Sequence, residues 1–184
     1  QAHNFVVGPL LGAAALADVN AARVLVTPAV MALPPLTQLL MPRLAERRTQ
    51  GTSSLSRGVL LMIGGLAAFA LCYAVALMAV LPWVLPLVLG DTYRHVGGLV
   101  LGWCVVALLL TLRSGLTIVL QVLRAFSDLL FANSAAAIVA VLLAVLLSKL
   151  WGASGAIVAF AAAEALLCIE MVFVLSARTV SQLV

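Results

Sequence analysis

Two arginines, Arg23 and Arg113, lie inside long runs of aliphatic residues, where a fixed charge is costly. A charged side chain at the centre of a bilayer costs a few kcal/mol even on the most lenient insertion scale, so it normally faces protein or water and marks a pathway. The planar guanidinium group pairs with phosphate oxygens through parallel hydrogen bonds and stays charged at any working pH. The two arginines are therefore candidate residues of a pathway through the protein.

Other polar side chains accompany each arginine on one face of a helix. At about 100° per residue, the polar residues near Arg23 fall within about 80° of one another, and those near Arg113 within about 100°. The run that holds Arg23 also contains three prolines, which kink helices and are tolerated in a bilayer where a neighbouring helix or a wet cavity satisfies the freed groups. We therefore predict that both faces line a cavity, and the predicted substrate-binding residues are Asn20, Arg23, Thr27, Gln38, Arg113, Thr117 and Gln121.

The depth of each arginine in its apolar run bears on whether it lines a cavity or snorkels to the membrane surface. Arg113 lies nine residues before the end of its run, about 14 Å by helical rise, which is too deep for easy snorkelling. Arg23 lies only about 10 Å deep, so a cavity role and snorkelling both remain open. Asp18 is about 140° around the helix from Arg23 and is a poor ion-pair partner for it. Glu164, in the last apolar run, is either a protonatable ion-coupling residue or the ion-pair partner of one of the arginines.

The elements that must position these residues follow from composition. Of the 184 residues 65% are hydrophobic and 9% are charged, whereas a soluble domain has about 45–50% and about 25%. We predict an all-α, multi-pass membrane protein with five complete transmembrane helices plus a partial one, forming a single transmembrane domain over residues 1–184. Each complete span is close to the roughly 20 residues that a crossing helix needs. The predicted spans are 16–40, 59–81, 96–122, 129–147 and 156–176.

The arrangement of arginines and tryptophans predicts the orientation. The loop 42–58 is rich in arginine, and by the positive-inside rule it faces the cytoplasm. Alternate crossing then places Trp83, Trp103 and Trp151 near the outer boundary, where amphipathic rings favour the headgroup layer. Gly64 and Gly65 are interpreted as a close contact between helices, because small residues let backbones approach.

Catalytic and metal-binding patterns are missing from the sequence. It contains no HExxH, no GxSxG, no glycine-rich phosphate loop followed by lysine and no paired carboxylates. The basic residues are spread thinly instead of forming the charge block of a nucleic-acid-binding tail. We therefore expect no enzyme activity, no metal or cofactor, and no nucleic-acid partner.

Three segments together resemble the carboxy-terminal half of bacterial polysaccharide flippases of the MOP superfamily. They are LLGAAALADVNAARVLVTPAVMALPPLTQLLMPRLAER at 10–47, LPWVLPLVLGDTYRHVGG at 81–98 and WGASGAIVAFAAAE at 151–164. The resemblance implies the second six-helix lobe of a twelve-helix transporter in the bacterial inner membrane, with the amino-terminal lobe and the start of the seventh helix missing. The family's cationic cavity, which receives the diphosphate of a polyprenyl-linked oligosaccharide, would then map onto Arg23 and Arg113.

Three other functions remain open at this stage. A multidrug or cation-coupled exporter of the same superfamily would favour carboxylates and aromatic residues in its cavity over arginines. A membrane enzyme acting on polyprenyl-linked sugars would need catalytic groups in a loop, for which Asp91 and His95 are the candidates. A structural subunit would use the polar faces as assembly contacts.

Overall fold

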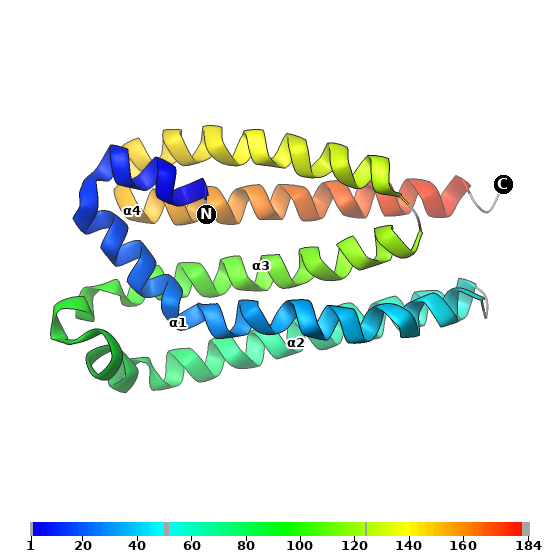
Figure 1. The fold of residues 1–184 in the computed structure, drawn as a ribbon, viewed down its shortest axis with the longest axis horizontal. Coiled ribbons are helices and arrows are strands. Elements are labelled where there is room, and N and C mark those ends of the chain that lie inside the picture. Colours follow the sequence, from blue (N-terminus) through cyan, green and yellow to red (C-terminus); the bar gives the residue numbers. More distant parts are fainter. Residues whose placement is uncertain (1, 50–51, 124, 182–184) are drawn as a thin grey trace.

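The chain folds into a bundle of long helices joined by short turns (Figure 1). A computed structural model describes residues 2–49, 52–123 and 125–181. Two short helical segments, the π-helical η1 and the 3-10 helix η2, connect the second and third long helices. The elements in order are α1 (Ala2–Thr49), α2 (Thr52–Val84), η1 (Leu85–Leu89), η2 (Asp91–Val96), α3 (Gly97–Val122) and α4 (Phe126–Ser181).

Four helices among the described residues are long and apolar enough to cross a membrane, so the predicted count of five and a partial one is not supported. The difference arises at two glycines. α1 bends at Gly12 and α4 reverses at Gly152, and in each case the two parts are joined by a single residue with non-helical angles and form one helical element. The predicted partial run and the first complete span therefore belong to α1, and the predicted spans 129–147 and 156–176 both belong to α4. Hydropathy alone does not distinguish a bend of one residue from a loop.

α4 folds back on itself at Gly152, and its two legs run antiparallel (Figure 1). We call residues 126–151 the first leg and residues 153–181 the second leg. Gly152 has φ +61°, a region that residues with a Cβ rarely adopt. Three residues later, a Cβ on Gly155 would overlap the carbonyl oxygen of Leu147 on the first leg. The GASG sequence at this position thus permits a tight reversal and close contact of the two legs.

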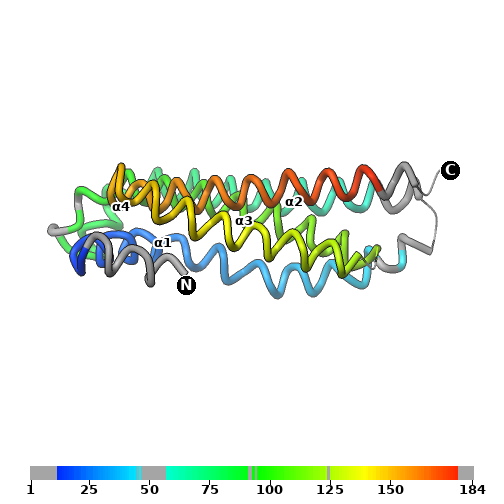
Figure 2. Tube along the Cα trace, turned by 90° about the horizontal axis from the view of Figure 1, so that it is seen from above, coloured from blue at the N-terminus to red at the C-terminus, as the bar shows by residue number. Residues whose placement is uncertain are grey.

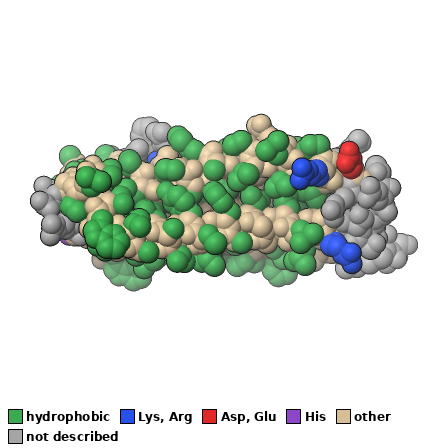
Figure 3. Space-filling model, turned by 90° about the horizontal axis from the view of Figure 1, so that it is seen from below, with side chains coloured by type: hydrophobic (Ala, Val, Ile, Leu, Met, Phe, Trp, Pro, Cys, Tyr) green, Lys and Arg blue, Asp and Glu red, His purple; other side chains and the backbone are tan. Residues whose placement is uncertain are grey.

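The turns alternate between the two ends of the bundle (Figures 1 and 2). We call the end where α1 finishes and α2 begins the arginine end, because Arg43 and Arg57 are exposed there. The opposite end holds η1, η2 and the bend of α4, and we call it the tryptophan end because Trp83 and Trp151 are exposed there. One face of the bundle is covered by hydrophobic side chains, with Lys and Arg gathered near one end (Figure 3). The assignment of the arginine end to the cytoplasm stays a prediction.

Several residues used for the orientation have other surroundings or lie outside the described part. Trp103 does not face the headgroup layer as predicted, because its ring is buried and only 6% exposed. Gly64 and Gly65 are exposed, and a Cβ on either would meet no atom within 4 Å. The predicted close helix contact therefore does not form within the described chain. Among Asp, Glu, Lys and Arg, the residues whose side chains lie outside the description are Arg47, Arg48, Asp91, Arg94, Arg124 and Arg178.

α3 is the central helix. In its most apolar stretch 56% of the residues are buried, compared with 22% or less in the other three spans. Two side chains bind backbone carbonyls of α1: Trp103 donates its indole N–H to Val19 at 3.1 Å, and Tyr73 donates its hydroxyl to Leu25 at 2.7 Å. These two hydrogen bonds attach α1 to α3 and α2. α1, α2 and α3 are therefore joined by polar contacts as well as by the apolar core at the tryptophan end.

Candidate functional site

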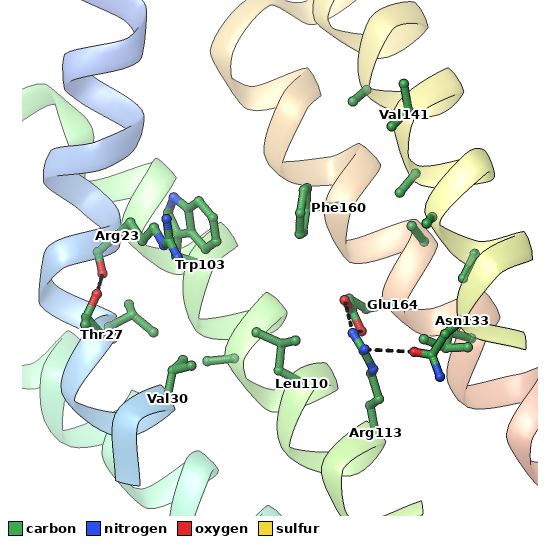
Figure 4. A pocket seen from close by; sticks show the side chains of 18 of the residues that line it. Arg23, Thr27, Val30, Trp103, Leu110, Arg113, Asn133, Val141, Phe160 and Glu164 are labelled. Atoms are coloured by element: carbon green, nitrogen blue, oxygen red, sulfur yellow. Dashed lines mark hydrogen bonds and ion pairs between the residues drawn. The ribbon is translucent and has the colours of Figure 1, made fainter. Parts of the chain in front are cut away.

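A cavity of about 550 Å³ lies between α1, α3 and both legs of α4 (Figure 4). Its walls are mostly apolar, and much of the wall is made of small side chains that leave the space open. A pocket of this size lies within the range of small-molecule sites, roughly 300–1,000 Å³. The alanines on its wall are Ala107, Ala136, Ala137, Ala140, Ala144 and Ala163.

Arg23 lines this cavity from α1 and lies against an aromatic side chain of α3 (Figure 4). Its guanidinium carbon is 5.6 Å from the centroid of the Trp103 ring, within the range of a cation–π contact. The Trp103 ring in turn lies 6.4 Å from that of Phe160 on the second leg of α4, at an angle of 44°. Thr27 also lines the cavity, and its hydroxyl donates to the carbonyl of Arg23 at 2.9 Å. Arg23 is thus placed on the wall of the cavity.

Arg113 reaches from α3 to both legs of α4 (Figure 4). Its Nη1 donates to the two carboxylate oxygens of Glu164 at 2.9 and 3.2 Å, and its Nη2 donates to Oδ1 of Asn133 at 2.9 Å. Glu164 is buried on the second leg, and Asn133 is half-buried on the first. Of the two interpretations of Glu164, ion pairing with an arginine describes its geometry. The charge of Arg113 is therefore compensated by a carboxylate in this conformation.

Asn133 lines the cavity and contacts Arg113, and the sequence did not predict it. Its Nδ2 donates to the carbonyl of Leu129 at 2.7 Å, so its Oδ1 faces the guanidinium group. The O and N atoms of an amide are assigned from such a network of hydrogen bonds. The available signal was a polar amide within an apolar run that otherwise lacks polar side chains up to Ser148, apart from the adjacent Ser134.

The two arginines lie at opposite ends of the cavity wall. Arg23 lies over Trp103, and Arg113 follows ten residues later on α3, which is about 15 Å along the helix axis. Between them the wall is apolar, with Val30, Leu110 and Phe160 among its residues (Figure 4). Arg23 and Arg113 therefore line the cavity at two separate positions, one beside Trp103 and one beside Glu164.

The remaining predicted site residues do not line this cavity. Gln38 is exposed and lies fifteen residues after Arg23, about 22 Å along a helix axis. Asn20 and Gln121 are half-buried outside the cavity lining, and the hydroxyl of Thr117 lies 4.0 Å from the sulfur of Met171. Helical spacing shows which residues share a face, but it does not show how far along the helix axis a cavity extends. The sequence therefore predicted a longer polar wall than the cavity has.

Polar residues at the tryptophan end form a separate contact. His95 Nε2 lies 3.2 Å from Oδ2 of Asp18, which joins η2 to α1. Within residues 2–49, 52–123 and 125–181, no group of three or more His, Cys, Asp or Glu side chains is placed to hold a metal ion. The site is therefore described by its arginines, their partners and the apolar wall between them.

Comparison of the chain with protein-family models, with curated proteins and with solved structures gives no match. The cavity itself and the sequence resemblance are therefore the observations that bear on function.

Proposed function

We propose that this chain is one lobe of a membrane transporter that moves a polyprenyl-diphosphate-linked oligosaccharide across the bacterial inner membrane. The observation that carries the proposal is the cavity wall, where guanidinium groups from two different helices face one apolar space. A transporter for such a substrate must carry a diphosphate through a low-dielectric layer, and fixed positive charge in a shielded cavity lowers that barrier. The lipid tail can stay in the bilayer while the head crosses.

The balance of charge on the wall favours an anionic substrate over a cationic drug. Two arginines and one glutamate line the cavity, so its formal charge is positive. A cavity for cations would need an excess of carboxylates or aromatic faces. The ring of Trp103 does offer an aromatic face, but Arg23 already lies over it.

The separation of the arginines gives the proposal a sequence of events. Arg23 lies against Trp103, and Arg113 follows Trp103 on α3 by about 15 Å of helical rise. A diphosphate would then contact Arg23 at the tryptophan end and Arg113 deeper in the bundle in succession. Alternating access then follows from rocking of two lobes about this site, a common solution in transporters. The second lobe, and with it the opposite wall, would be the amino-terminal half of the same protein.

A transport assay with the protein expressed from its complete gene tests this proposal. Proteoliposomes would carry a fluorescent polyprenyl diphosphate, and a membrane-impermeant quencher added outside would report how much lipid reaches the outer leaflet. We expect transfer by the wild-type protein and at least about tenfold slower transfer by Arg23→Gln and by Arg113→Gln, since each removes a charge worth about 1.4 kcal/mol or more to the anion. Glu170→Gln, on α4 but outside the cavity lining, is the control and should transfer normally.

Two results would count against the proposal. Transfer at the rate of protein-free vesicles by a folded wild-type protein would exclude this substrate class. Wild-type rates in both arginine variants would show that the guanidinium groups are structural, as in an assembly subunit.

A further inference from the structure

We infer that Glu164 is an exchangeable counter-ion that competes with the anionic ligand for Arg113, while Asn133 holds the guanidinium group in place during the exchange. The inference rests on the proposed function and concerns the regulation of the same cavity. It begins from an asymmetry in the contacts of Arg113, whose Nη1 meets a charged acceptor and whose Nη2 meets a neutral one.

The carboxylate and a phosphate group would need the same donor. Glu164 presents both its oxygens to Nη1, at 2.9 and 3.2 Å, which is the part of the guanidinium fork that a phosphate would use. Both residues line the cavity, so an incoming anion can reach this contact (Figure 4). A buried arginine is not left uncompensated if phosphate oxygens arrive as the carboxylate leaves. Binding at Arg113 is therefore weakened by the internal carboxylate that must be displaced.

Asn133 has the geometry of a positioning residue. It accepts from Nη2 at 2.9 Å, and its own orientation is fixed by its bond to the carbonyl of Leu129. Because an amide carries no net charge, it keeps the guanidinium group in position without cancelling its charge. When Glu164 withdraws, Arg113 still points into the cavity from α3.

Binding of a defined probe to the full chain in lipid nanodiscs tests the exchange. The probe is farnesyl diphosphate, with farnesol as its uncharged match and empty nanodiscs as the blank, and isothermal titration calorimetry gives Kd. Glu164→Gln keeps the shape and removes the negative charge, so we expect it to bind the diphosphate about tenfold more tightly than wild type. Glu170→Gln lies on the same leg outside the cavity lining and should leave Kd unchanged.

A second variant tests the opposite direction and covers the case in which Glu164→Gln does not fold. Asn133→Asp places a second carboxylate beside Arg113, so we expect about tenfold weaker binding of farnesyl diphosphate and no change for farnesol. Opposite shifts in the two variants would support the exchange. Where Glu164→Gln does not fold, weaker binding by Asn133→Asp together with unchanged binding of farnesol would support it.

The failures of the two ideas are distinguishable. If wild type binds the diphosphate better than farnesol, but Glu164→Gln or Asn133→Asp binds it as wild type does, the counter-ion inference is wrong and the proposed function stands. If wild type and the folded variants do not distinguish farnesyl diphosphate from farnesol, the proposed function fails and the inference fails with it.

Discussion

The two ends of the cavity hold the same kind of charge in different ways. Near the tryptophan end Arg23 lies over the indole ring of Trp103, and deeper in the bundle Arg113 is held between a carboxylate and an amide. An aromatic face attracts a cation without cancelling its charge, whereas a carboxylate cancels it. A ligand at Arg113 would therefore compete with Glu164 for the guanidinium group, whereas the ring of Trp103 would not compete with a ligand at Arg23.

This difference shows that an arginine in an apolar run has two properties that need separate tests. One is the electrostatic attraction that it offers to a ligand, and the other is its contribution to the packing of the bundle. Arg113 joins α3 to both legs of α4, so its removal affects both properties. The cation–π contact of Arg23 with Trp103 is weaker than a buried ion pair, so its loss should cost less stability than the loss of the pair between Arg113 and Glu164.

The largest expected effect comes from Gly155→Ala, at the bend of α4 that joins the two legs contacting Arg113. The added Cβ would overlap a backbone oxygen of Leu147, which cannot move aside as a side chain can. We expect the free energy of unfolding to fall by about 3 kcal/mol or more. Thermal unfolding and size-exclusion chromatography in detergent would measure the loss. Gly64→Ala has open space around its Cβ and is the matched control, so equal losses in the two variants would contradict the close contact.

Arg113→Leu should have the next largest effect, because it leaves the buried carboxylate of Glu164 without its guanidinium partner. We expect a loss of about 3 kcal/mol in the free energy of unfolding. The double variant Arg113→Leu/Glu164→Leu should recover most of that stability but none of the diphosphate binding. Chemical unfolding of the four species of this cycle would show the coupling, and additive losses would mean that the ion pair contributes nothing to stability.

Trp103→Phe sharpens the comparison at the other end of the cavity. It keeps an aromatic face for Arg23 and removes the indole N–H that donates to the carbonyl of Val19. We expect the free energy of unfolding to fall by about 1 kcal/mol, with diphosphate binding reduced by less than in Arg23→Gln. Calorimetric titration beside thermal unfolding would separate the two, and a complete loss of binding would show that the ring itself meets the ligand.

Arg23→Lys should have the smallest effect on stability, within about 0.5 kcal/mol of wild type. It keeps the positive charge and loses the planar fork. In an export assay with the complete gene, this variant should retain more activity than Arg23→Ala. Equal loss of export in both would show that fork geometry, and not charge, is required at Arg23.

The sequence predicted long apolar helices and Arg23, Thr27 and Arg113 on a cavity wall, because each depends on local composition and helical spacing. For Glu164 the sequence left ion pairing with an arginine as one of two interpretations. It did not predict the count of helices, since a single glycine can continue or reverse a helix without changing hydropathy. It also missed Asn133, whose role depends on contact between α3 and the first leg of α4.

Trp103 shows the same limit in another way. As an amphipathic residue near the end of an apolar run it indicates a headgroup position, yet its N–H meets the carbonyl of Val19, 84 positions away in the sequence. Contacts between residues this far apart depend on how helices face one another. Which helix faces are in contact depends on the packing of the whole bundle and cannot be predicted from one apolar run.

The reversal of α4 at Gly152 brings together the two side chains that contact Arg113. Asn133 and Glu164 lie on different legs of α4, and the legs are pressed together at Gly155. The turn lies at the tryptophan end, and Asn133 and Glu164 lie further along the two legs. A small change in the angle between the legs would therefore change the distance between these two side chains and weaken their contacts with Arg113.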